Sequence, residues 1–303
     1  MGLQDVWGPL LAWDLFLGGA GAAAYIIGVV ALWLGGKYLR LAKPGIFAGP
    51  PLVALGALLL LLELGNPLRA WMGFLRPGSS MMSVGILLIS LFIVLGFLHI
   101  LFLLFPKLGV KAGLLKLLGT VTAVIGLGVI LYTGLLLGLV KAVPFWNTPM
   151  LPLLFLVSAL LSGAGVVILV AGLQRWVAPK KVKAEEVGES VGGLVPTVVL
   201  LLVVELLVLF LLLFLTNGGS VVAATSAKFL LSGAYATAFW VGVVVVGVVL
   251  PLLLVLWVLG RRGKMTLGRA VDISTLAAFC LLVGGLILRY AVVAAGANVS
   301  SLL

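Results

Sequence analysis

Five polar side chains interrupt or border the apolar runs of this sequence, and these are the residues that could do chemistry. They are Asp14, Glu63, Arg69, Tyr132 and Arg289. A carboxylate can accept a proton and pass it on, a phenol can donate a hydrogen bond, and an arginine can stabilise negative charge. In apolar surroundings charged groups are costly, so they indicate a function by default. Together these residue types favour proton-coupled chemistry on the polar head of a ligand.

Each of these residues also has a structural interpretation that the sequence leaves open. Asp14 could face lipid headgroups, and Glu63 could form an ion pair with Arg69 that locks a helix to its loop. Tyr132 could be an anchor at the membrane interface, and Arg289 could reach to the surface along its aliphatic stem.

The elements that position these residues follow from the composition. The chain of 303 residues is 64% hydrophobic and 9% charged, whereas a soluble domain is about 25% charged. The apolar runs are continuous and long enough for helices that cross a bilayer, which need roughly 20 residues. The sequence therefore predicts an all-α integral membrane protein with eight transmembrane helices, at about 10–35, 46–65, 83–105, 114–140, 150–173, 195–216, 229–259 and 270–296.

The distribution of charge predicts the orientation. Most of the 19 lysines and arginines lie in or beside the loops after the first, third, fifth and seventh spans, and such loops are typically cytoplasmic. Both termini are then expected on the outer, periplasmic side. The net charge of +11 is thereby attributed to loops and not to nucleic-acid binding.

This topology predicts a binding site in the outer half of the membrane. Asp14, Glu63, Tyr132 and Arg289 come from four different spans and are expected at a similar depth, next to the loop that carries Arg69. Convergent polar groups in an apolar surround are typical of a ligand site. An amphipathic ligand such as a quinone fits, because its head exchanges protons at two oxygens.

A polar stretch at 177–193 divides the chain. We expect a cytoplasmic linker there, with five helices in 1–176 and three in 194–303. The first four helices are the expected quinone-binding half. A single cysteine, Cys280, cannot hold an iron–sulfur cluster, and a single histidine, His99, cannot supply two axial ligands to a haem.

Two further polar residues within the apolar runs keep a second function open. Glu205 either pairs with another helix or belongs to a proton path, and His99 is expected to make a satisfied polar contact. A proton- or ion-translocating subunit, or a secondary transporter, could instead use Glu205, His99 and Glu63 as a path. A passive structural anchor is a third interpretation.

Motifs along the whole chain resemble the NrfD/polysulfide-reductase family of membrane subunits. They are WDLFLGGAGAAA, LELGNPLRAW, RPGSSMMSVG, LYTGLLLG and LILRY. In the polysulfide-reductase branch a histidine stands at the position of Asp14, and an asparagine at that of Leu11. By this resemblance Tyr132 and Asp14 would hold a quinone head, while Glu63 and Arg69 match the acid and the arginine of the second motif.

The resemblance also implies a cofactor, partners and a location. The cofactor would be a quinone, menaquinone in particular, with no haem and no iron–sulfur cluster in this chain. The partners would be an iron–sulfur subunit of the four-cluster ferredoxin type, docked on the outer loops, and a molybdopterin catalytic subunit. The chain would be a multi-pass protein of a prokaryotic inner membrane. It would exchange electrons between membrane quinol and the iron–sulfur subunit of a respiratory oxidoreductase.

Overall fold

The structure is a computed structural model that describes residues 8–63, 74, 80–177, 184–261 and 263–300. These residues form helices and no strand. The main helices are α1 (Pro9–Leu34), α2 (Leu39–Glu63), α4 (Met81–Leu104), α5 (Ala112–Gly138), α6 (Met150–Val177), α7 (Ala184–Asn217), α8 (Val221–Leu231), the π-helix η5 (Ala238–Val249), α9 (Leu250–Gly260) and α10 (Leu267–Ser300). Eight spans within the described residues are long and apolar enough to cross a membrane. The predicted all-α membrane architecture is thereby confirmed.

The seventh span differs from its predicted range of 229–259. The short helix α8 ends at Leu231, and the chain turns at Gly233 before η5 begins at Ala238. Glycine weakens a helix interior because its backbone loses the most entropy on folding. The π-helix η5 then passes into α9 next to Pro251, which has no N–H to donate backwards. The span that enters the bundle is therefore Ala238–Gly260.

The expected linker at 177–193 is partly helical. Residues 178–183 lie outside the described part of the chain, but α7 already begins at Ala184. Val187, Val191 and Val195 follow one another at helical spacing and are all buried. Because this apolar face has a partner to pack on, the polar composition of the stretch does not prevent a helix.

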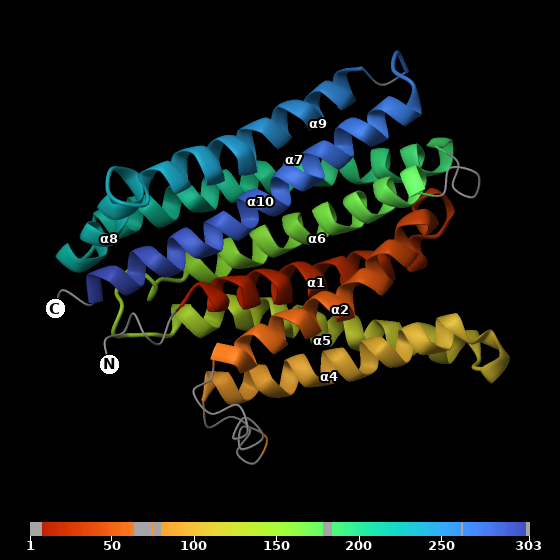
Figure 1. The fold of residues 1–303 in the computed structure, drawn as a ribbon, viewed down its shortest axis with the longest axis horizontal. Helices are drawn as coiled ribbons and strands as arrows, with labels where there is room; N and C mark the ends of the chain where they lie inside the picture. Colours follow the sequence, from red (N-terminus) through yellow and green to blue (C-terminus); the bar gives the residue numbers. More distant parts are fainter. Residues whose placement is uncertain (1–7, 64–73, 75–79, 178–183, 262, 301–303) are drawn as a thin grey trace.

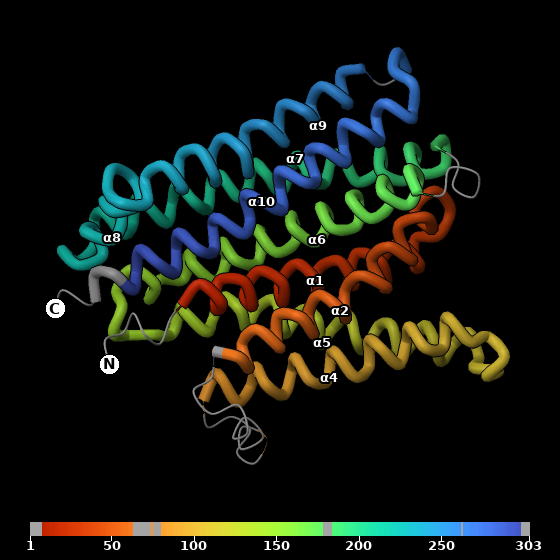
Figure 2. The backbone as a smooth tube through the Cα atoms, viewed as in Figure 1, coloured from red at the N-terminus to blue at the C-terminus, as the bar shows by residue number. Residues whose placement is uncertain are grey.

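The helices lie side by side in one bundle, with α1, α6 and α10 in its middle (Figures 1 and 2). Helices α2, α4 and α5 lie on one side of these three, and α7, η5 and α9 lie on the other. Helix α1 begins and α10 ends at the same end of the bundle (Figure 1). An even number of crossings requires this arrangement, and which side of the membrane that end faces stays a prediction.

Glycines allow the closest helix contacts. A Cβ on Gly21 of α1 would lie 2.8 Å from the carbonyl oxygen of Gly49 in α2, and a Cβ on Gly284 of α10 would overlap Gly247 of η5. Small residues let helix backbones approach in a membrane, where packing replaces the hydrophobic effect as the force between helices. The glycine-rich pieces around Gly21 and Gly284 are thus packing faces.

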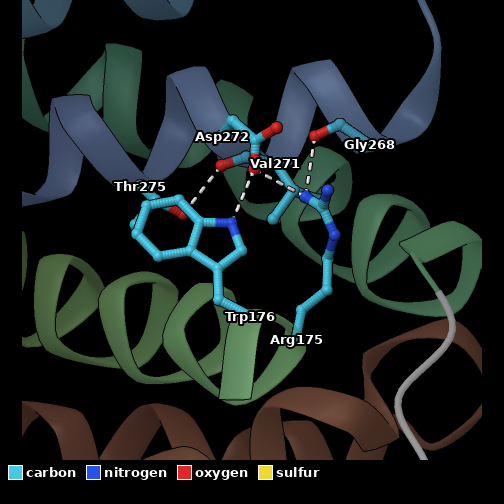
Figure 3. A network of polar contacts seen from close by, with 6 residues as sticks. All are labelled: Arg175, Trp176, Gly268, Val271, Asp272 and Thr275. Atoms are coloured by element: carbon cyan, nitrogen blue, oxygen red, sulfur yellow. Dashed lines mark hydrogen bonds and ion pairs between the residues drawn. The ribbon is translucent and has the colours of Figure 1, made fainter. Parts of the chain in front are cut away.

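A polar network fastens α6 to α10 at the other end of the bundle (Figure 3). Arg175 Nη1 donates to Asp272 Oδ1 at 2.7 Å and to the Gly268 carbonyl at 2.9 Å, and Trp176 Nε1 donates to Asp272 Oδ1 at 3.0 Å. The Asp272 carboxylate thus accepts hydrogen bonds from two side chains in the last turn of α6. These bonds hold the first turns of α10 against the end of α6.

Candidate functional site

Asp14 is a buried acid in the second turn of α1. Its exposed fraction is 3%, so it does not face headgroups. The opposing residue of α2 is Gly56, where a Cβ would lie 3.2 Å from Asp14 Oδ1. The carboxylate therefore lies against the backbone of α2, at a position where glycine leaves it room.

Tyr132 lies close enough to Asp14 to interact with it electrostatically. Tyr132 belongs to α5 and is 2% exposed, so it is no interfacial anchor. Its ring and hydroxyl lie directly on Gly85 of α4, where any side chain would overlap them. Residues of α1, α2, α4 and α5 thus meet at one place, which we call the Asp14–Tyr132 site.

The Asp14–Tyr132 site combines a hydrogen-bond donor with a proton acceptor. The phenol of Tyr132 can donate to a carbonyl oxygen, and the carboxylate of Asp14 can accept a proton from a hydroxyl. Both side chains are buried between packed helices, so their positions are set before any ligand arrives. Such an arrangement suits a ligand whose oxygens alternate between carbonyl and hydroxyl.

Arg289 is fully buried in α10 and makes contacts within the protein. Its Nε donates to the Leu15 carbonyl at 3.3 Å, Nη1 to Ser158 Oγ at 2.9 Å, and Nη2 to the Phe155 carbonyl at 3.4 Å. The Phe155 ring centre lies 5.0 Å from the guanidinium carbon. The arginine does not reach the surface. It ties α1 and α6 to α10, and its partner on α1, Leu15, is the residue that follows Asp14.

Glu205 of α7 completes a buried charge pair with Arg289. The two side chains interact electrostatically, and Ser158 hydrogen-bonds to the carboxylate. Glu205 is 6% exposed and Ser158 is 1% exposed. A cavity of about 10 Å³ adjoins Glu205 and Ser158, which is near the lower limit for one water molecule. Of the two interpretations that the sequence leaves open for Glu205, the structure shows the interaction with another helix; a role in a proton path stays a prediction.

Ser158 is a site residue that the sequence pattern did not single out. It lies within an apolar run, VSALLSG, where a serine looks like a small packing residue. The signal available was its spacing from Ser162, which also lines the small cavity. The two serines are four residues apart, and that places both hydroxyls on one face of α6.

Most of the loop predicted to face outward lies outside the part of the chain that the structure describes. The backbone of Glu63 ends α2 at the same end of the bundle as Asp14, and its side chain lies outside the described residues. Arg69, Arg76 and Trp71 also lie outside them. Asp14 and Tyr132 are therefore the two predicted site residues that the structure brings together, with Arg289 tied to the same turn of α1.

His99 lies toward the opposite end of the bundle. Its Nδ1 is 2.6 Å from Tyr25 Oη in a hydrogen bond, and the two residues are 1% and 0% exposed. The prediction of a satisfied polar contact for His99 is confirmed. Tyr25 is a partner that sequence spacing could not identify, because 74 residues separate the two.

Comparisons with known proteins agree with this architecture. The family described as "Polysulphide reductase, NrfD" matches residues 1–300. Protein NrfD of Escherichia coli (strain K12) is 33% identical over 314 aligned residues, which cover 96% of this chain and 95% of that protein. The C subunit of polysulfide reductase from Wolinella succinogenes is 31% identical, with 82% of each protein covered. The chain is a multi-pass membrane protein that belongs to the NrfD/polysulphide reductase family.

Proposed function

We propose that this chain is the quinone-reactive membrane subunit of a respiratory oxidoreductase. The observation that carries the proposal is the pairing of Asp14 with Tyr132, a buried acid and a buried phenol from α1 and α5. Family membership supports it, because one relative is named as the C subunit of a polysulfide reductase, a name that implies further subunits.

The residues at the Asp14–Tyr132 site fit a quinone head. A quinone supplies two-electron, two-proton chemistry when bound. The Tyr132 hydroxyl would hold one oxygen of the head by a hydrogen bond, and Asp14 would take or return a proton at an oxygen. Glu63, at the end of α2, would pass protons between Asp14 and the outer face. Arg69 would add positive charge to the site from the outer loop. Arg289 would keep the Asp14 turn of α1 in place through the Leu15 carbonyl.

Partners would complete the electron path, since one cysteine and one histidine supply no iron–sulfur cluster or bis-histidine haem site. We propose that an iron–sulfur subunit of the four-cluster ferredoxin type docks on the outer loops, beside the end of the bundle that holds Asp14. A molybdopterin subunit would carry the terminal reaction. The complex would lie in a prokaryotic inner membrane and use menaquinone.

The test is binding of a fluorescent quinol analogue to the purified complex with its partner subunits. Tyr132→Phe removes the hydroxyl and keeps the ring, and Asp14→Asn removes the charge and keeps the shape. Saturable binding near one equivalent at this site, weakened severalfold by each change, would support the proposal. Tyr290→Phe is the matched control, because Tyr290 is half exposed on α10 and should bind as the wild type does.

Unchanged binding and unchanged quinol oxidation in both variants would overturn the site. A complex that assembles and binds no quinol analogue at all would instead favour the passive structural anchor.

A second candidate function is proton translocation, and the Glu205–Arg289 pair favours it. A carboxylate beside a water-sized cavity, in the middle of a membrane span, could hold a proton in transit. Complexes reconstituted in vesicles would then change the internal pH during turnover, and Glu205→Gln would abolish the change while quinol oxidation continued. Turnover without any pH change beyond that of quinol chemistry would exclude this function.

A further inference from the structure

A groove at the end of the bundle opposite Asp14 has the features of a ligand site. It has a volume of about 270 Å³ and runs between α1, α4 and α5. Its walls are apolar, from Trp33, Leu103 and Leu115, and Lys116 lies at its rim. We call it the His99 groove, because His99 is its one buried polar side chain among the described residues that line it.

The imidazole of His99 is held in a fixed position. Tyr25 Oη lies 2.6 Å from Nδ1 in a hydrogen bond. The centres of the Tyr25 and His99 rings are 5.9 Å apart, and the rings meet edge to face. Gly119 of α5 also lies against the imidazole, because a Cβ there would come within 2.9 Å of His99 Cε1. Tyr25 and Gly119 thus hold the imidazole in place. Such support is typical of a side chain in a ligand-binding site.

The second ring nitrogen determines which ligand fits. With Nδ1 engaged by Tyr25, Nε2 is the ring nitrogen left to meet a ligand in the groove. In one tautomer Nε2–H donates to a carbonyl oxygen, and in the other Nε2 accepts from a hydroxyl. A quinone head presents a carbonyl when oxidised and a hydroxyl when reduced, so the imidazole can match either form.

A phospholipid fits the groove less well. Its phosphate would go to Lys116 at the rim and its acyl chain would cover His99, which would leave a buried polar nitrogen against hydrocarbon. An unsatisfied polar group in such surroundings is costly. The volume is just below the range of small-molecule pockets, which suits a flat head whose tail remains in the lipid, next to the half-exposed ring of Trp33.

We propose that the His99 groove is a second binding site for an isoprenoid quinone, at the opposite side of the membrane from the Asp14–Tyr132 site. Asp14 and Val29, which also lines the groove, lie fifteen residues apart on α1, or about 22 Å along a helix. Binding alone is proposed for this groove. The proposal rests on the proposed function, because it takes quinone as the ligand of this protein.

The test is photo-crosslinking of the purified complex, in lipid nanodiscs, with an azido-naphthoquinone. Labelled peptides are mapped by mass spectrometry. Adducts are expected on the ends of α4 and α5 around His99, and an excess of menaquinone should remove them. Adducts near Tyr132 report the first site separately, so each site is scored in the same sample.

Variants test the groove directly. Ala112→Trp fills the groove from its exposed rim and should lower the His99-region adducts at least tenfold. Leu114→Trp is the control, because Leu114 is exposed two residues away and does not line the groove. His99→Leu removes the ligand's hydrogen bond and should weaken labelling on the order of fivefold.

The outcomes separate this proposal from the proposed function. Adducts at the Asp14–Tyr132 site alone would overturn the second site and leave the first. Adducts in the His99 groove alone would overturn the first site as the place of quinone binding. Absence of adducts at both would overturn both. A photoreactive phospholipid that labels the groove, and that menaquinone does not displace, would identify a lipid and overturn the quinone assignment.

Discussion

The ring and hydroxyl of Tyr132 lie against the backbone of Gly85 so closely that any side chain at Gly85 would overlap them. Helix α4 therefore sets where the phenol of α5 points, although α4 itself supplies no polar group to the pairing of Asp14 with Tyr132. The glycine makes a specific change possible, one that moves the phenol without removing it.

Gly85→Ala is expected to displace the Tyr132 hydroxyl and to weaken binding of a quinol analogue on the order of tenfold, because small misplacements of positioning groups are costly. The measurement is fluorescence quenching in the intact complex. Gly113→Ala is the control, since a Cβ there meets nothing within 4 Å. Equal affinity for Gly85→Ala and the wild type would show that the position of Tyr132 does not matter for binding.

The Glu205–Arg289 pair is expected to behave as a unit. Glu205→Leu leaves a buried guanidinium without its counter-charge and should destabilise the protein by about 3 kcal/mol. The double variant Glu205→Leu/Arg289→Leu should be less destabilised than the sum of the two single changes. Thermal unfolding in detergent, followed by tryptophan fluorescence, measures all four corners of the cycle.

If the destabilisation of the double variant equalled the sum of the two single changes, the pairing would be refuted. Glu189→Leu is a suitable comparison, because Glu189 lies on the exposed surface of α7 and its loss should change the unfolding midpoint little.

The contact between α10 and η5 depends on two glycines. Gly284→Val would drive a branched side chain into the backbone of Gly247, and overpacking of this kind costs about 1–3 kcal/mol. A lower unfolding midpoint is expected, with loss of the cavity beside Glu205 that Gly247 and Gly284 line. Gly260→Val, where the space around a Cβ is open, should have a much smaller effect. Equal midpoints for the two variants would contradict the close approach.

The network in Figure 3 predicts a moderate effect on stability. Arg175→Met removes the ion pair to Asp272 and the bond to the Gly268 carbonyl. Because both charged side chains are partly exposed, the expected loss is about 1 kcal/mol. Lys264→Met, on the exposed loop at the same end, serves as the control. A midpoint for Arg175→Met that matches this control would show that the network does not fasten α6 to α10.

Sequence patterns were sufficient for the number of spans and insufficient for several of their boundaries. Helix α2, for example, begins at Leu39 and not near residue 46. Eight continuous apolar runs predict eight spans, because each helix must satisfy its backbone in lipid by itself. The early start of α7 was missed because a glutamate, a serine and three glycines stand among Val187, Val191 and Val195, so their shared face becomes apparent only beside its packing partner. The break at Gly233 was missed because apolar residues continue on both sides of it.

The sequence by itself determined which residue types the membrane spans contain: an acid in α1, a phenol in α5, an acid in α7 and an arginine in α10. Those residue types restrict the possible chemistry, because a charged side chain in an apolar medium is either paired with another group or part of a functional site. Only the tertiary structure decided the partners. Tyr132 interacts with Asp14, Arg289 with Ser158 and Glu205, and His99 with Tyr25. These contacts join residues that are far apart in the sequence, and they depend on how the glycine faces allow the helices to pack.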